Sequence, residues 1–570
     1  MTHVGQQLVD ELISYGVTHV FGCPGGQTMP LYNGIARRPG QIAHVLMHDE
    51  RSAVYAADGY ARASGRLGVC DATVGPGASN LVSGLVEAYS SSIPVLAIVS
   101  DIQRDWEHFR DLGSASQAFR QHRFLEGCVK FLGRVEQPAN LVPMLQAGLR
   151  AATSGRPGPV VLEIPDDVFG APAPERGAVT PRAADGFLRL RPGADPTAVA
   201  AAAATIRAAT RPVVIAGGGA LYAGAGPAVV ALAEALRSPV ATTISGKGVI
   251  DERHDLAVGV VGTFGLPLAN SVVAQADCVI FIGSKAGQGT TLGYQLPRPG
   301  VPVVHIDIDP TEIGRGFPAA VGVYADARLG TVALTEALRD APATTWDLAE
   351  IAVLRSQWWD GPVVYDEEPV AGVVKPQDVV RAMSAQMGEA DTFVADASLS
   401  SGWGATRWPV REAGARFFAP RGLAGLGWSL PAAIGVAAAR SAGSARVVSL
   451  AGDGGWSYSL GEVETAARMG SGTVSVILNN STLGWIRQGA ASRYPGEMVS
   501  QDFLAVSYAD AAAALGAATC AAEDLAAFRS AFGQALADRS GRPWVIEVRS
   551  CAVESPVQQM PDGARAPGGY

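Results

Sequence analysis

Two consecutive stretches, SLAGDGGWSYSL (449–460) and VILNNSTLG (476–484), are the most informative part of this 570-residue sequence. Each begins with an apolar run typical of a buried strand and ends in glycine, aspartate or asparagine. A helical stretch separates them, which predicts parallel strands whose carboxyl ends lie at one edge of a sheet. Ligands of open α/β sheets bind at that edge, so we expect a site there.

The polar residues at this edge have the chemistry of a magnesium site. Asp453 lies between Gly452 and Gly454, and Asn480 follows the next strand. One carboxylate, one amide oxygen and a backbone carbonyl suit Mg²⁺ when phosphate and water complete its coordination, so a diphosphate cofactor is implied. A lone Gly-Asp-Gly is more often an ordinary turn. The asparagine pair after a second strand favours the shared site instead.

Short β-rich runs alternate with helical stretches along the rest of the chain. This pattern predicts an α/β fold of three consecutive doubly wound parallel-sheet domains. Two stretches without apolar periodicity, about 165–196 and 340–375, are expected to be linkers, the second with the acidic DEEP at 366–369. The expected units are an N-terminal domain at 1–175, a central domain at 190–340, a C-terminal domain at 365–550 and a tail at 551–570. The strongest strand candidates are THVFG (18–22), AHVLM (43–47), PVLAIVS (94–100), PVVLEI (159–164), RPVVIAGGGA (211–220), SPVATTISGKG (238–248), CVIFIGSK (278–285), VPVVHIDIDP (301–310), DTFVAD (391–396), ARVVSLAGDG (445–454), TVSVILNN (473–480) and PWVIEV (543–548).

Composition excludes several other classes of protein. The formal net charge is −9, which argues against nucleic acid as a partner. The 68 glycines and 36 prolines are too many for a helical bundle. Six widely spaced cysteines without a C-x-x-C pair indicate free thiols in a reducing compartment. With neither a basic, apolar leader nor a membrane-length apolar run in the sequence, we expect a cytoplasmic protein without a membrane partner.

Several motifs in order resemble the acetolactate (acetohydroxyacid) synthase branch of the thiamine diphosphate-dependent enzymes, and the resemblance extends over nearly the whole chain. The matching stretches are FGCPGGQTMPLYNGI (21–35), HDERSAVYAADGYARASG (48–65), TVGPGASNLVSG (73–84), GLGWSLPAAIG (425–435), GDGGWSYSLGEVET (452–465) and NNSTLGWIRQ (479–488). The resemblance implies a pyrimidine-binding, a middle and a diphosphate-binding domain, with thiamine diphosphate and Mg²⁺ as cofactors.

The resemblance assigns the catalytic carboxyl group to Glu50, which aligns with the glutamate that hydrogen-bonds the aminopyrimidine ring of the cofactor. That contact favours the imino tautomer, which removes the proton from the thiazolium C2. From the residues alone, an exposed acid at a helix start is the alternative. Leu426 corresponds to the apolar side chain beneath the cofactor.

The remaining cofactor contacts also follow from the resemblance. Asp453, Asn480 and the carbonyl of Thr482 are expected to hold the metal. Residues expected around the cofactor are Pro24, Gly25, Pro76, Asn80, Ser398, Ser400, Ser401, Gly425, Gly452, Gly454, Gly455, Leu483 and Gly484. In the loop DASLSSGW (396–403), Leu399 and Ser400 replace the family's Gln-His pair, so serine hydroxyls are the expected phosphate contacts.

A glutamine near the thiazolium would donate to a developing oxyanion. Gln117 is the expected residue when the loop is aligned through Cys128 and Lys130, and Gln121 is the alternative.

Departures from the family concern the substrate and the middle domain. The family's acceptor-pocket tryptophan and the methionine before it correspond to Gly489 and Trp485, and Gln27 stands where alanine is common. These three residues predict an acceptor pocket of altered shape. The glycines at 217–219 suit a nucleotide loop such as the FAD site of true acetolactate synthases. GSKAGQGTT (283–291) lacks the family's arginine-bearing stretch, so FAD is possible but is not our expectation.

The expected activity is a carboligase that decarboxylates a 2-keto acid, in the simplest case pyruvate, and transfers the acyl carbanion to a carbonyl acceptor. The alternatives are a non-ligating 2-keto acid or acyl-CoA decarboxylase and, from another class, an inactive regulatory homologue. The resemblance further implies a homodimer or homotetramer whose active site lies at the subunit interface.

Overall fold

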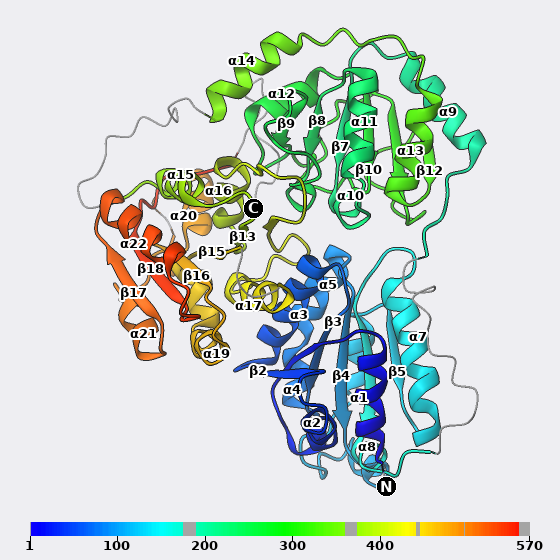
Figure 1. Cartoon of the computed structure of the whole chain (residues 1–570), viewed down its shortest axis with the longest axis vertical. Coiled ribbons are helices and arrows are strands. Elements are labelled where there is room, and N and C mark those ends of the chain that lie inside the picture. The colour runs from blue at the N-terminus through cyan, green and yellow to red at the C-terminus, as the bar shows by residue number, and fades with distance from the viewer. Residues whose placement is uncertain are drawn as a thin grey trace.

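The computed structural model describes residues 2–174, 190–359, 373–440, 445–494, 496 and 498–557. Within these residues the chain forms three six-stranded sheets, and all of their strand pairs are parallel. Figure 1 shows the three units one after another along the colour ramp, with the green central unit above the other two. The predicted fold class is therefore confirmed.

The N-terminal unit has the strand order β2-β1-β3-β4-β6-β5. Its strands are β1 (His19–Gly22), β2 (Ala43–Leu46), β3 (Gly68–Ala72), β4 (Val95–Asp101), β5 (Phe131–Arg134) and β6 (Val160–Pro165). Its helices are α1 (Val4–Ser14), α2 (Met29–Ala36), α3 (Glu50–Ser64), α4 (Pro76–Asn80), α5 (Val82–Ser91), α6 (Gln121–Glu126), α7 (Leu141–Thr153) and α8 (Asp166–Phe169).

The central unit has the order β12-β11-β10-β7-β8-β9. Its strands are β7 (Pro212–Ala216), β8 (Val240–Thr242), β9 (Ala257–Val260), β10 (Cys278–Ile282), β11 (Val303–Asp307) and β12 (Val321–Tyr324). Its helices are α9 (Pro196–Arg207), α10 (Gly218–Tyr222), α11 (Gly226–Leu236), α12 (Pro267–Gln275), α13 (Ala327–Ala337) and α14 (Leu348–Trp359).

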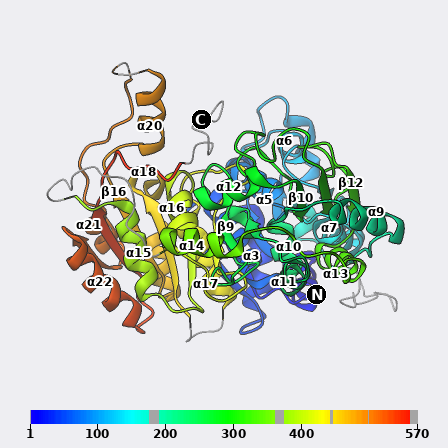
Figure 2. The same ribbon diagram turned by 90° about the horizontal axis from the view of Figure 1, so that it is seen from above.

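The C-terminal unit has the order β14-β13-β15-β16-β18-β17. Its strands are β13 (Thr392–Ala395), β14 (Phe417–Phe418), β15 (Val447–Gly452), β16 (Val474–Asn479), β17 (Ala518–Ala522) and β18 (Trp544–Arg549). Its helices are α15 (Pro376–Gln386), α16 (Leu399–Arg407), α17 (Ser429–Ala439), α18 (Asp453–Trp456), α19 (Glu462–Met469), α20 (Gly484–Arg493), α21 (Tyr508–Ala514) and α22 (Leu525–Ala537). Figure 2 shows α20 projecting from this unit.

The stretches expected to be linkers contain helices. The first includes α8 and leads into α9, and the second includes α14. The apolar residues of these helices lack the regular spacing by which a helix is predicted from sequence. In α14, for example, Ile351 is buried against the central unit but does not belong to a continuous apolar stripe. The acidic residues 366–369 lie outside the described residues.

Helices α3 and α17 pack the N-terminal unit against the C-terminal unit. A Cβ at Gly435 would lie 1.9 Å from the carbonyl oxygen of Ala56, and a Cβ at Gly59 would lie 2.3 Å from that of Ala432. Only glycine allows the two backbones to approach so closely. Trp428 adds a hydrogen bond of 3.0 Å from its indole nitrogen to Asp58.

Candidate functional site

Asp453 and Asn480 lie at neighbouring positions on the carboxyl edge of the third sheet. β15 ends at Gly452, which is opposite Leu478 of β16. A Cβ at Gly454 would lie 2.8 Å from the side chain of Leu483, so the loops that follow the two strands touch. The fold thus brings together the two motifs that stand apart in the sequence.

Asp453 is buried with a carboxylate oxygen that has no partner. The residue is 2% exposed, and its Oδ2 forms no hydrogen bond within the part of the chain that the structure describes. Burial raises the pKa of Asp453 to about 6, while the backbone N–H groups of Gly454 and Ser481 lower it. An unpaired buried carboxylate is costly unless a cation neutralises it, so this donor fits Mg²⁺.

The two asparagines after β16 have different surroundings. The side-chain amide of Asn479 donates to Glu547 at 2.6 Å and to the carbonyl of Val506 at 3.1 Å, so Asn479 is held by the protein. Asn480 accepts one hydrogen bond, from the N–H of Thr482 at 3.2 Å, and an amide oxygen has a second lone pair. The hydroxyl of Thr482 donates to the carbonyl of Gln501 at 3.0 Å, which leaves the Thr482 carbonyl as the group expected to reach a metal.

A residue that the sequence reasoning missed, Asp396, fixes the loops on the other side of this edge. It is buried at the end of β13 and accepts hydrogen bonds from the N–H groups of Ala397, Gly427 and Ser429 at 2.8, 3.1 and 2.8 Å. Because the sheet order reverses between β13 and β15, the loops after these strands diverge and leave a crevice between them. The signal that could have identified Asp396 in the sequence is an aspartate directly after a predicted strand.

These loops border a cavity of about 2080 Å³ whose wall is formed by all three units. The expected site residues in its wall are Ser398, Ser400, Leu426, Gly452, Asp453, Gly454, Gly455, Asn480, Thr482, Leu483, Gly484, Trp485 and Gly489. Two expected cofactor contacts of the C-terminal unit, Ser401 and Gly425, lie outside the wall. The hydroxyl of Ser401 donates to the carbonyl of Asp396 at 2.6 Å, and Gly425 packs against the hydroxyl of Tyr55. Residues 551–557 reach the same wall through Cys551, Glu554, Ser555 and Val557.

The expected pyrimidine contacts form a second group at the carboxyl edge of the first sheet. The side-chain amide of Asn80 donates a hydrogen bond of 2.9 Å to the carboxylate of Glu50, which is the first residue of α3. Thr73 donates to Gln27 at 3.0 Å and packs against Gly25, while a Cβ at Gly77 would lie 3.1 Å from both Thr73 and Glu50. Pro24 adjoins Gly25, and Pro76 begins α4.

The two groups do not share a cavity within one chain. Pro24, Gly25, Gln27, Glu50, Pro76, Asn80 and Gln117 are absent from the described wall of the large cavity. Within one chain, Gln27 is therefore not in the wall that contains Trp485 and Gly489, the other two residues expected at the acceptor pocket.

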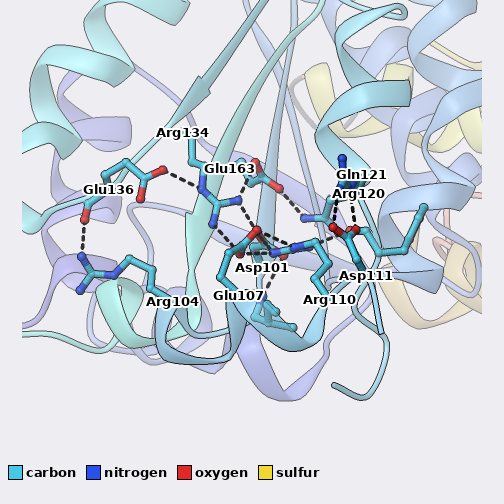
Figure 3. A network of polar contacts seen from close by, with 12 residues as sticks. Asp101, Arg104, Glu107, Arg110, Asp111, Arg120, Gln121, Arg134, Glu136 and Glu163 are labelled. Atoms are coloured by element: carbon cyan, nitrogen blue, oxygen red, sulfur yellow. Dashed lines mark hydrogen bonds and ion pairs between the residues drawn. The ribbon is translucent and has the colours of Figure 1, made fainter. Parts of the chain in front are cut away.

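The two candidate glutamines differ sharply in environment. Gln121 is fully buried; it accepts from the Gly75 N–H at 3.1 Å and donates to the Ser100 carbonyl at 2.9 Å and to Glu163 at 2.7 Å. Figure 3 shows it within a network that includes Asp101, Arg110 and Arg134. Gln117 is exposed, and its backbone carbonyl abuts Gly75. This environment makes Gln121 a support of the Gly75 turn and leaves the side chain of Gln117 available to a ligand.

The central glycines have a packing explanation. A Cβ at Gly217 would lie 2.3 Å from the carbonyl oxygen of Gly283, and one at Gly219 would lie 3.0 Å from the same atom. Close backbone packing therefore accounts for these two glycines, and they supply no independent support for FAD. Among the described residues, no helix has both the length and the apolar character required to cross a membrane.

A buried aspartate and an asparagine at the carboxyl edge of one parallel sheet, with a glutamate at the carboxyl edge of another, are the arrangement expected of a thiamine diphosphate enzyme. Family models agree: residues 2–125 match the N-terminal TPP binding domain of thiamine pyrophosphate enzymes, 199–336 the central domain and 396–548 the C-terminal TPP binding domain.

Similar curated proteins show which branch of the thiamine diphosphate enzymes the chain belongs to. The chain is 34% identical over 504 residues to "Acetolactate synthase" of Arthrospira platensis, covering 84% of this chain and 82% of the relative. It is 34% identical over 506 residues to "Acetolactate synthase large subunit" of Parasynechococcus marenigrum (strain WH8102), covering 87% of this chain and 79% of the relative. The chain is 31% identical over 519 residues to "Probable acetolactate synthase large subunit" of Methanocaldococcus jannaschii, and the match covers 88% of this chain and 84% of the relative. The chain belongs to the acetolactate synthase family.

Proposed function

We propose that the protein is a thiamine diphosphate- and Mg²⁺-dependent carboligase that decarboxylates a 2-keto acid, in the simplest case pyruvate, and joins the remaining acyl unit to a carbonyl acceptor. The observation that carries this proposal is the buried Asp453 with an unpaired carboxylate oxygen beside Asn480. The relatives named acetolactate synthase support the type of reaction.

The cofactor, when bound, supplies the electron sink for decarboxylation and carbon–carbon bond formation. Asp453, Asn480 and the Thr482 carbonyl would hold the metal that neutralises the diphosphate. Asn80 fixes the carboxyl group of Glu50, which would hold the proton shared with the ring nitrogen of the aminopyrimidine. Leu426 would support the cofactor from the cavity wall.

The same proposal includes an assembly of at least two chains. Glu50 and its neighbours lie outside the cavity that Asp453 borders, so one chain does not bring both ends of a cofactor site together. A second copy whose N-terminal unit faces this cavity would complete it, which favours a homodimer or homotetramer. The cysteines are free thiols, in agreement with the reducing cytoplasm as the compartment.

The test uses the full chain loaded with thiamine diphosphate and Mg²⁺. We expect pyruvate to release CO₂ and to give a ligated product by mass spectrometry, and we expect the cofactors together to raise the melting temperature. Asp453→Asn, which keeps the size of the side chain and removes its charge, should lose the Mg²⁺-dependent part of that rise. Free acetaldehyde without ligated product would indicate the non-ligating decarboxylase, and neither CO₂ release nor stabilisation would contradict the proposal.

A further inference from the structure

The carboxylate of Glu87 in the N-terminal unit is bound by the backbone of the C-terminal unit. Glu87 lies in α5 and is fully buried. It accepts hydrogen bonds from three consecutive N–H groups, those of Gly422, Leu423 and Ala424, at 3.0, 2.7 and 2.9 Å. These residues belong to the loop between β14 and α17, called here the Leu426 loop (residues 419–428). Consecutive N–H groups that converge in this way form an anion-binding concavity, and Glu87 supplies the anion.

Glu87 is held as a charged carboxylate. Burial alone would raise its pKa, but Arg62, the Ser91 hydroxyl and two N–H groups of the Leu426 loop outweigh burial and lower the pKa. Arg62 donates to Glu87 at 3.2 Å, and Ser91 donates to it at 2.6 Å. Arg62 also donates to the carbonyl of Ala419, the first residue of the loop, at 3.1 Å. The charge pair therefore holds the beginning of the loop as well as its middle.

Two residues of the loop have backbone conformations that need such support. Ala424 has a φ of +59°, in the left-handed region that is unfavourable for any residue but glycine. Such a conformation persists where the surrounding structure fixes it, and the bond from the Ala424 N–H to Glu87 contributes to that. Gly427 has a φ of +82°, and its N–H donates to Asp396 at 3.1 Å. The two turns enclose Leu426.

Leu426 connects this loop with the cavity and the metal motif. It lies in the cavity wall, and its Cδ2 is 3.8 Å from the Cβ position of Gly455, two residues after Asp453. The loop is held on both sides of Leu426 by acids of the N-terminal unit, since Asp58 accepts from the indole of Trp428. A change in the shape of the loop would therefore move Leu426 relative to Asp453.

We propose that Glu87 is a positioning residue for the cofactor: its carboxylate fixes the shape of the Leu426 loop and so holds Leu426 where it supports the bent cofactor whose C2 proton is removed. This inference rests on the proposed function, to which the role of Leu426 belongs. A support that is fixed before the cofactor arrives costs no ordering entropy when it binds. It also keeps the reacting groups of the bound cofactor in their working geometry.

Glu87→Gln tests the proposal, because it removes the charge and turns an N–H donor toward the N–H groups of the loop. Without cofactor, hydrogen–deuterium exchange of peptides covering 420–426 in the full chain should quicken at least about tenfold, the contribution of one charged hydrogen bond. With saturating thiamine diphosphate and Mg²⁺, exchange of the cofactor C2 proton, measured by NMR, should slow at least about tenfold. A merely structural role would lower the melting temperature or weaken cofactor binding without slowing C2 exchange in the bound cofactor.

Asp391 provides a matched control. This buried carboxylate also accepts from backbone N–H groups, those of Gly388 and Arg446 at 2.8 and 2.7 Å. It directly precedes β13, so it lies at the opposite, amino edge of the same sheet. Asp391→Asn should leave C2 exchange within about threefold of the unchanged protein. Equal slowing in Asp391→Asn and Glu87→Gln would attribute the effect to lost stability and overturn the proposal.

Ala424→Gly tests the loop from its other partner. Glycine adopts a positive φ without strain, so the double variant Glu87→Gln/Ala424→Gly should exchange the C2 proton at least about threefold faster than Glu87→Gln alone. No recovery would show that the loss does not come from the shape of the loop. Should Glu87→Gln fail to fold, Glu87→Asp keeps the charge on a shorter side chain and should give the same changes at smaller size. Unchanged loop and C2 exchange in Glu87→Asp would overturn the proposal.

Two results separate this inference from the proposed function. If the unchanged protein exchanges the C2 proton but forms no ligated product, and Glu87→Gln slows that exchange, the carboligase proposal fails and the positioning role stands. If the unchanged protein forms ligated product and Glu87→Gln leaves C2 exchange unchanged, the carboligase proposal stands and the positioning role is refuted.

Discussion

Replacing Gln121 by leucine should loosen the turn that begins at Gly75. The substitution introduces an apolar side chain of similar volume. It removes the side-chain partner of the Gly75 N–H and one partner each of the Ser100 carbonyl and of Glu163, which keeps its ion pair with Arg134 at 3.3 Å. A buried polar group that loses its partner costs about 1–3 kcal/mol. For the Gly75 amide this is a factor of about 5 to 150 in the local opening equilibrium.

Hydrogen–deuterium exchange of peptides covering 73–80 measures this opening. The matched control is Gln117→Leu, because the Gln117 side chain is exposed and forms no hydrogen bond with a described residue. We expect exchange at Gly75 to quicken by the factor above in Gln121→Leu and to stay within about twofold in Gln117→Leu. Gln117→Leu should instead lower kcat if its amide donates to a developing oxyanion.

The opposite pattern would refute this reasoning. If Gln121→Leu left exchange at Gly75 unchanged and abolished turnover, Gln121 would be the group near the reacting atoms. Gln117 would then have no assigned role.

Three further predictions concern separate parts of the molecule. Glu50→Gln should keep thiamine diphosphate binding and slow exchange of the cofactor C2 proton at least about 100-fold, as measured by NMR. Unchanged exchange would show that Glu50 does not activate the cofactor. Burial lowers the pKa of Lys285 to about 8 because it disfavours the charged ammonium, and Arg156 adds to the effect. Acetic anhydride should therefore label Lys285 half-maximally near pH 8, and a midpoint near 10.5 would contradict the burial. Gly435→Ala should destabilise the fold by about 1–3 kcal/mol in thermal unfolding, because its Cβ would overlap the backbone of α3, whereas Gly287→Ala, in open space, should not.

The alternation of short apolar runs was sufficient to predict three parallel sheets, because buried parallel strands read as continuous Val, Ile and Leu. Strands without that composition were missed. Gly68–Ala72 contains the buried Asp71, which is paired with His44 at 2.9 Å, and Ala518–Ala522 consists largely of small residues. A strand that is stabilised by a hydrogen bond to a residue distant in the sequence, or by packing against its neighbours, has no strong local signal.

The candidate site was predictable where its chemistry is local in sequence. Asp453 and Asn480 each follow a recognisable strand, so their approach could be anticipated. The environment of Gln121 could not, because the groups that hold it, at Gly75, Ser100 and Glu163, come from three separate segments.

Helix α3 has a consequence for how two sites in an assembly would communicate. Its first residue is Glu50, and its middle packs against α17, which begins three residues after Leu426. A 15-residue helix is a stiff rod of about 22 Å. In the proposed dimer, one end of this rod would serve the partner's cofactor while its side supports the cavity of its own chain. A displacement of α3 caused by a ligand in one cavity would thereby alter the position of Glu50 in the other, so the two sites of the proposed dimer would be mechanically coupled.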